Sequence, residues 1–111
     1  MLTIVELPEY LRAAEKLLDE EERSAIVTAL ARTPAAGALL VGTGGIRKLR
    51  WARPGTGKSG GVRVIYYFHN TGMPLFLLSL FAKGTKPDLS KSERNELAAL
   101  ARYLRSQTAG N

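Results

Sequence analysis

The side chains best suited to chemistry in this sequence are cations that share one acid-free segment. Between Gly42 and Gly84 the sequence contains no Asp or Glu. The cations of this segment are Arg47, Lys48, Arg50, Arg53, Lys58, Arg63 and Lys83. Cations without neutralising carboxylates are typical of a surface that binds phosphate. The segment therefore favours a binding site for an anionic partner over a solvated basic face without function.

An alternating pattern separates some of these cations from the expected core. Over residues 45–52, side chains of a strand would point alternately to two faces. This places Lys48 and Arg50 on one face and Leu49 and Trp51 on the other. We therefore expect one face of this strand to be basic and the other to be buried.

Two later strand-like runs each carry a further cation. Arg63 lies between two valines, and Lys83 follows the last apolar run. If the strands are neighbours in one sheet, these residues converge with the first pair on a single patch. The predicted phosphate-binding patch, named here the cationic site, consists of Lys48, Arg50, Arg63 and Lys83.

A glycine-rich run looks like a nucleotide-binding loop but stands in the wrong context. Residues 52–59 fit a relaxed phosphate-loop pattern. Such a loop must lead into a helix, whereas residues 62–68 are strand-like. We therefore expect a basic hairpin loop that contacts RNA or nothing, and not nucleotide hydrolysis.

Other reactive side chains are scarce. The sequence has no Cys, and His69 is its single histidine. A thiolate metal site, a cysteine nucleophile and a histidine pair are therefore excluded, and we expect no metal or cofactor. Asp88 is interpreted as an alternative cap to Ser90, and of Tyr66 and Tyr67 we expect one in the core and one free to stack on a base.

Length and periodicity predict a single α+β domain over residues 1–106, with a disordered tail at 107–111. A short strand at residues 2–5 precedes a helical hairpin or one kinked helix between Pro8 and Pro34. A small antiparallel sheet and a C-terminal helix follow, which gives the order β-α-α-β-β-β-β-α.

The later strands and the last helix have clear local signals. We place strands at about residues 39–41, 45–52, 61–69 and 74–83. Asn70-Thr71-Gly72 is predicted to form the last hairpin turn, because Asn and Gly accept positive φ. Ser90 and Glu93 have the spacing of a capping box before the final helix.

Charge and hydropathy bear on partners and location. The formal charge of +6 and the sequence pI near 10.0 favour an anionic partner. No apolar stretch of signal-peptide length opens the sequence, and no apolar run approaches the roughly 20 residues of a membrane span. We therefore expect a soluble, cytoplasmic protein without membrane contact.

Several segments resemble the HigB branch of the RelE/ParE toxin superfamily. They are residues 42–50 (GTGGIRKLR), 57–61 (GKSGG), 62–68 (VRVIYYF), 78–84 (LSLFAKG) and 89–93 (LSKSE). The resemblance covers most of the chain and implies a small sheet with helices on one side. It also implies a type II toxin-antitoxin toxin that acts as a ribosome-dependent endoribonuclease, or mRNA interferase, in the ribosomal A site and so inhibits translation.

The resemblance further implies partners and residue roles. The partners are the ribosome, mRNA and a HigA-like antitoxin, through which the complex would bind operator DNA. The residues that match the family's catalytic positions are Lys48, Arg50, Arg63 and Lys83, and the expected RNA contacts are Arg47, Arg53, Lys58, Tyr66 and Lys86. An arginine that some members carry after the last strand falls near Gly84, and their tyrosine before the final helix has no clear match.

The implied reaction is attack of a ribose 2′-OH on the adjacent phosphate, which needs a base, charge stabilisation and an acid. We take Lys48 as the base, because the cations Arg50 and Arg63 disfavour its charged form. Arg63 would brace the phosphate, and Lys83 would serve as stabiliser or acid. The alternatives are a ParE-like inhibitor of DNA gyrase on the same fold and an RNA-binding module without chemistry.

Overall fold

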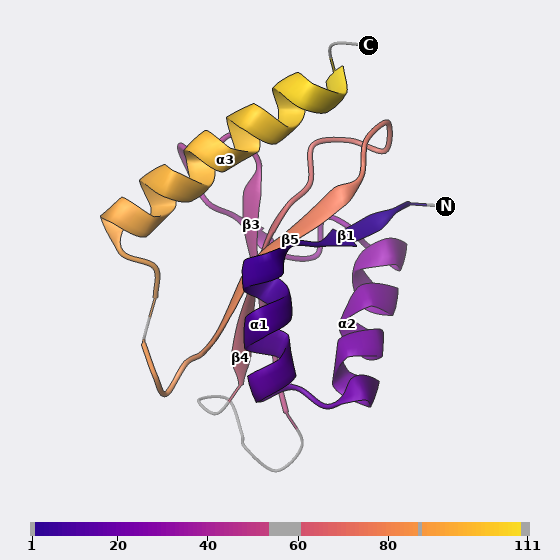
Figure 1. Ribbon diagram of the computed structural model, residues 1–111, viewed down its shortest axis with the longest axis vertical. Helices are drawn as coiled ribbons and strands as arrows, with labels where there is room; N and C mark the ends of the chain where they lie inside the picture. The colour runs from indigo at the N-terminus through magenta and orange to yellow at the C-terminus, as the bar shows by residue number, and fades with distance from the viewer. Residues whose placement is uncertain (1, 54–60, 87, 110–111) are drawn as a thin grey trace.

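The elements follow the order that the sequence predicts. The computed structural model describes residues 2–53, 61–86 and 88–109 (Figure 1). The elements are β1 (Ile4–Glu6), α1 (Pro8–Leu17), α2 (Glu20–Arg32), β2 (Ala38–Leu39), β3 (Ile46–Trp51), β4 (Val62–Tyr67), β5 (Leu75–Ala82) and α3 (Lys91–Ala109). The α+β class and the order β-α-α-β-β-β-β-α are confirmed.

The five strands form one mixed sheet in the order β1-β5-β4-β3-β2. Strands β2 to β5 are antiparallel to their neighbours, as expected for a meander. β1 instead runs parallel to β5, with Ile4 opposite Leu75. The predicted antiparallel meander is therefore confirmed for β2 to β5, and the sheet is mixed because β1 adds a parallel edge. Between β1 and β2 the chain passes through α1 and α2, so the meander begins at the far edge and ends beside β1.

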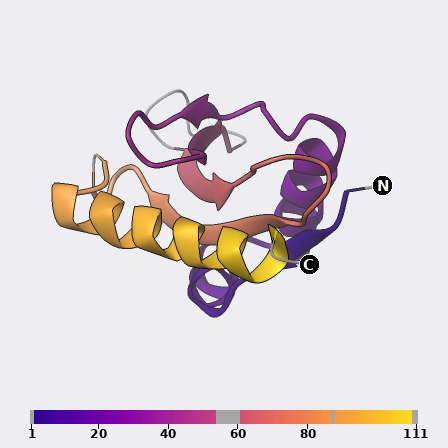
Figure 2. The same cartoon turned by 90° about the horizontal axis from the view of Figure 1, so that it is seen from above.

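Alternate side chains of β4 enter two separate cores. Val62, Val64 and Tyr66 pack with α1 and α2. Ile65 and Tyr67 pack with residues of α3. Figure 2 shows α2 at one side of the strands and the first turns of α3 at the other. The helices therefore cover both faces of the sheet, and the expectation of helices on one side was wrong.

The first helical region consists of two helices that lie side by side (Figure 1). α1 ends at Leu17, and a capping box starts the next helix. The Glu22 N–H donates to Asp19 Oδ1 at 2.8 Å, and the Asp19 N–H donates to Glu22 Oε1 at 3.2 Å. These bonds satisfy amide groups that the first turn of a helix leaves unpaired. Of the two predicted forms, the structure has the helical hairpin.

The turn between β4 and β5 and the start of α3 form where they were expected. Asn70 Oδ1 accepts the Gly72 N–H at 2.8 Å. Neither residue has positive φ, so the side chain of Asn70 makes this turn instead. Ser90 and Glu93 form the predicted capping box.

α3 is longer than the sequence suggested. It continues to Ala109, beyond the boundary placed at residue 106. Residues 110–111 lie outside the described part of the chain. Within the described residues, none of the helices combines the length and apolar character that a membrane span requires.

Candidate functional site

The pairing of β3 with β4 places two arginines opposite each other. Lys48 lies opposite Ile65, and Arg50 lies opposite Arg63, on the face that α3 covers in part. Leu49 packs on the α1–α2 core instead. Lys48 and Arg50 therefore share one face of β3 and Leu49 lies on the other, as predicted. The expectation of one basic and one buried face was wrong, because the fully buried Ile46 lies on the face of Lys48 and Leu49 is only partly buried. Directly opposed residues of antiparallel strands have Cβ atoms about 4.5–5.5 Å apart.

Arg63 is almost fully buried, with 4% of its surface exposed, whereas Arg50 is exposed. The Arg63 Nη1 donates to the backbone oxygen of Val62 at 3.3 Å. Within residues 2–53, 61–86 and 88–109, no ion pair with a carboxylate is found for Arg50, Arg63 or Lys83. A buried charge without a counter-charge is costly to the fold. A bound anion would relieve this cost.

β5 brings Lys83 to the same end of the sheet. Phe81 lies opposite Arg63, and Ala82 lies opposite Val62. The Lys83 N–H then donates to the backbone oxygen of Gly61 at 3.2 Å, which continues this ladder by one step. The backbones of Lys48, Arg50, Arg63 and Lys83 are thus gathered on three adjacent strands and their ends.

Lys48 differs from the other cations of the site because it has a carboxylate partner. Its Nζ donates to Asp88 Oδ1 at 3.1 Å, and Asp88 also accepts the Leu89 N–H at 2.8 Å. The backbone hydrogen bond from Leu89 and the ammonium of Lys48 hold the pKa of Asp88 below its usual range. Asp88 was interpreted as an alternative helix cap, but Ser90 makes the cap and Asp88 contacts the cationic site.

Lys86 lies beside the site but is also engaged. It forms an ion pair with Glu93 of α3, and its Nζ lies 4.9 Å from the centre of the Phe81 ring. Hydrogen bonds from Lys86 and from the Ser90 N–H lower the pKa of Glu93. Lys86 therefore bridges the end of β5 and the first turn of α3.

Tyr66 and Arg47, two of the predicted RNA contacts, lie on the sheet face opposite to the cationic site and hold the loop between α2 and β2. Tyr66 is fully buried; its hydroxyl donates to Pro34 O at 2.7 Å and accepts the Gly37 N–H at 2.8 Å. Burial raises the pKa of this hydroxyl. Arg47 Nη1 donates to Gly37 O at 2.8 Å and to Ala35 O at 3.3 Å. A ring without exposed surface offers no face on which a base could stack, so Tyr66 serves the scaffold.

The remaining predicted contacts are Arg53 and Lys58, which follow β3 in the sequence. Arg53 makes a two-pronged ion pair with Glu22 of α2, at 2.9 and 3.1 Å. Lys58 lies outside the described residues. Arg53 thus ties the end of the β3 segment to α2.

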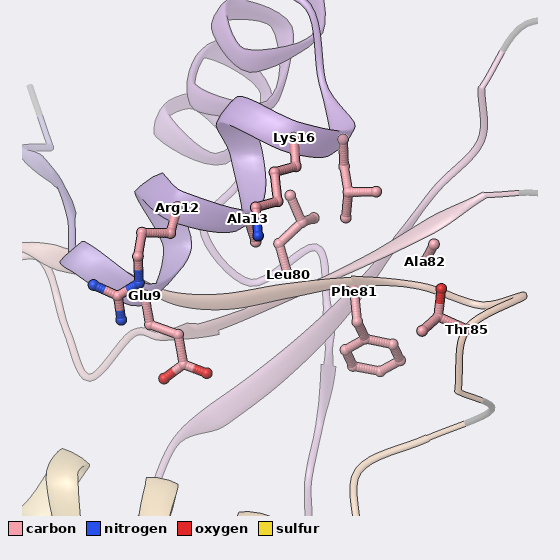
Figure 3. Close-up of a pocket in the computed structure, with 9 residues that line it drawn as sticks. Glu9, Arg12, Ala13, Lys16, Leu80, Phe81, Ala82 and Thr85 are labelled. Atoms are coloured by element: carbon pink, nitrogen blue, oxygen red, sulfur yellow. The ribbon is translucent and has the colours of Figure 1, made fainter.

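A groove of about 400 Å³ lies between α1 and the second half of β5. Figure 3 shows Leu80 pointing toward α1 and Phe81 pointing to the other side of the strand. Arg12, Lys16 and Glu9 line its rim. None of the predicted site residues that the structure describes lines this groove. Among the described residues, no cluster of His, Asp and Glu suits a metal ion.

Fold and site together define a small basic α+β protein with arginines paired across one sheet face. The chain belongs to the RelE toxin family: the family model for the RelE toxin of the RelE / RelB toxin-antitoxin system matches residues 9–110. The family gives the chain the role of a toxin.

A solved structure has the same fold. The free state of an E. coli RelE toxin mutant, in which two arginines are replaced by alanine, is similar with a TM-score of 0.61 and 16% sequence identity. The similarity covers 86% of this chain and 95% of that chain. At this identity the similarity supports the fold alone.

Sequence reasoning missed the carboxylates at the site. Asp88 and Glu93 lie outside the acid-free segment, forty and seven residues from their lysine partners. The capping spacing of Ser90 and Glu93 was recognised, but a cap alone does not indicate which strand the helix start will face. The position of the segment before α3 relative to β3 was needed to find the Lys48–Asp88 pair, and the path of the chain from β5 to α3 was needed to find the Lys86–Glu93 pair.

Proposed function

We propose that this toxin is a ribosome-dependent endoribonuclease that cleaves mRNA in the A site and so inhibits translation. The observation that carries the proposal is the opposed pair Arg50 and Arg63, with Arg63 buried and with no carboxylate described beside either. Like charges placed opposite each other destabilise a sheet. An RNA phosphate bound between them would offset that repulsion, whereas a protein that only inhibits another protein has no need of the pair.

The proposed reaction is a transfer within the RNA. The ribose 2′-oxygen bonds to the adjacent phosphorus, the bond from phosphorus to the 5′-oxygen breaks, and a proton moves from the 2′-OH to a base while another reaches the 5′-oxygen. Arg63 and Arg50 brace the phosphate, because guanidinium groups donate in a planar fork and remain charged. Lys83 stabilises the extra charge or donates the proton.

We keep Lys48 as the proposed base, with a condition. In the free protein its Nζ donates to Asp88 Oδ1 at 3.1 Å. Lys48 can therefore reach the ribose 2′-OH only after the contact with Asp88 has been broken. Arg53, Lys58 and Lys86 are proposed to contact RNA beyond the cleaved phosphate.

The proposed partners are mRNA, the ribosome and a cognate antitoxin in the cytoplasm. The family description names a toxin-antitoxin system, which supports an antitoxin partner. A HigA-like antitoxin that carries the complex to operator DNA, and membership of the HigB branch, are the finer parts of this proposal. Anionic RNA surfaces suit the charge of +6.

The test is primer extension on mRNA in a reconstituted translation system. Wild-type protein is compared with Arg63→Ala and with Arg102→Ala, in which an exposed arginine of α3 is removed. We expect new 5′ ends inside translated codons for wild type and Arg102→Ala, and none for Arg63→Ala or without ribosomes. Intact mRNA in this system, together with growth arrest of cells in which the protein is induced, would instead favour the gyrase inhibitor. RNA binding that falls with salt but leaves the strand uncut would favour the non-catalytic module.

A further inference from the structure

The carboxylate of Asp88 lies where two elements distant in sequence meet. It accepts a hydrogen bond from Lys48 Nζ at 3.1 Å and one from the Leu89 N–H at 2.8 Å. Its side chain is 56% exposed, whereas that of Lys48 is 21% exposed. The carboxylate is therefore held at the surface by donors that face it from β3 and from the start of α3.

A third positive group acts on the same carboxylate. The Leu89 N–H and Lys48 lower the pKa of Asp88, and the charge of Arg94, in the first turn of α3, adds a smaller contribution. Arg94 reaches across to the chain before β3, where its Nη2 donates to Val41 O at 3.4 Å. The Asp88 carboxylate thus contacts an ammonium and a backbone N–H and lies in the field of a guanidinium, and these are groups that bind phosphate in proteins.

We propose that the Asp88 carboxylate occupies a phosphate-binding position of the RNA path, formed by Lys48, Arg94 and the Leu89 N–H, and that an RNA phosphate displaces it. This inference rests on the proposed function, and it adds a phosphate position beside the one between Arg50 and Arg63. Lys48 and Arg50 are two residues apart on one face of β3, a separation of about 6.5–7 Å. Successive phosphates of one RNA strand can therefore occupy the two positions.

Displacement of the carboxylate requires little free energy. The departing group, Asp88, is the exposed member of the pair, and ion pairs at the surface contribute little net stability. Two anions cannot share the same donors without strong repulsion, so a phosphate must drive the carboxylate into solvent. Lys48 then exchanges its carboxylate partner for a phosphate of the substrate, which makes its ammonium a phosphate ligand in place of the proposed base, and Asp88 keeps the free toxin in a resting state.

The test compares Asp88→Asn with Glu21→Gln. Asn retains an oxygen that can accept the hydrogen bond from the Leu89 N–H, so the substitution removes the charge and keeps this hydrogen bond. Glu21→Gln changes the net charge by the same amount, at an exposed position of α2 away from the site. The probe is a fluorescently labelled single-stranded oligonucleotide with 2′-O-methyl groups, which cannot be cleaved, and binding is followed by anisotropy against salt concentration.

We expect Asp88→Asn to bind about fivefold more tightly than Glu21→Gln, because one repulsive charge at close range is removed. We expect Arg94→Ala to weaken binding and to lower the salt slope by about 1, the effect of losing one phosphate contact. Equal affinity of Asp88→Asn and Glu21→Gln, or unchanged binding by Arg94→Ala, would overturn the inference.

An Arg50→Ala variant in the same assay separates this inference from the proposed function. If Arg50→Ala weakens binding while Asp88→Asn matches its control, the RNA site stands and only the Asp88 position is wrong. If Arg50→Ala binds as wild type does, the proposed RNA site itself fails. Far-ultraviolet circular dichroism of each variant confirms that the compared proteins are folded.

Discussion

Arg50 and Arg63 lie directly opposite each other across the β3–β4 ladder, one exposed and the other 4% exposed. Such an arrangement lowers the stability of the free protein, because the like charges repel and the inner one is desolvated. A phosphate bound between the two arginines would remove this repulsion, so the arrangement that destabilises the free protein favours phosphate binding. Stability and function should therefore respond in opposite directions when the inner charge is removed.

Replacement of Arg63 by methionine tests this opposition. Methionine fills a similar volume without charge, so we expect the free energy of unfolding to rise by about 1 kcal/mol. Cleavage of ribosome-bound mRNA should be lost in the same variant. Urea unfolding and primer extension measure the two effects. A variant that is less stable than wild type and still cleaves would contradict this account of Arg63.

A matched pair of tyrosine variants tests the scaffold under the site. Tyr66→Phe removes the partner of the buried Gly37 N–H, and we expect a loss of about 1–3 kcal/mol. The Tyr10 hydroxyl is buried and has no hydrogen-bond partner among the described residues. Tyr10→Phe should therefore leave the stability unchanged or raise it by up to about 1 kcal/mol. Urea midpoints with unchanged slopes give both values, and equal losses in the two variants would refute the contrast.

Alkaline pH should destabilise the protein through Tyr10. Burial, with a smaller contribution from Glu6, raises the pKa of Tyr10 from 10.0 to about 12. Because the pKa is higher in the folded state, the unfolded chain loses this proton first. The contribution of the protonated Tyr10 hydroxyl to the stability of the folded state is complete below pH 10, and it is lost as the pH rises from 10 through about 12. The free energy of unfolding, measured with urea at each pH of this range, should fall more steeply for wild type than for Tyr10→Phe. Parallel curves for the two proteins would exclude the effect.

Gly61 allows β3 and β4 to approach each other at the edge of the site. A Cβ atom at this position would lie 2.5 Å from the backbone oxygen of Trp51. We expect Gly61→Ala to cost roughly 1–3 kcal/mol and to reduce cleavage, because the start of β4 must shift beneath Arg63. Gly84→Ala is the control, since among the described residues no atom beyond its two chain neighbours lies within 4 Å of its added Cβ. Thermal unfolding should separate the two variants, and similar midpoints would rule out the close approach.

Much of the local structure follows from short-range patterns in the sequence. Alternation along 45–52 correctly divides Lys48 and Arg50 from Leu49. The spacing of Ser90 and Glu93 correctly marks the start of α3. Both signals work because strand alternation and helix capping act between residues at most a few positions apart. The cations of the acid-free segment also include those that lie on β3 and β4 and at the end of β5.

The contacts of those cations depended on pairing over long distances. The partnership of Lys48 with Asp88 joins residues forty positions apart, and no local pattern indicates it. The parallel pairing of β1 with β5 arises in the same way, because it depends on where the chain re-enters the sheet after α2. Local propensity carries no information on such neighbours.

The tyrosines of β4 show the division between the two levels. The sequence by itself determined that Tyr66 and Tyr67 point to opposite faces, since alternation is a property of every strand. Only the tertiary structure decided that both are fully buried, because α1 and α2 cover one face of the sheet and α3 covers the other. A single helical layer would have left one ring exposed to stack on a base. Burial depends on what packs against a surface, and that is settled only when all the elements are assembled.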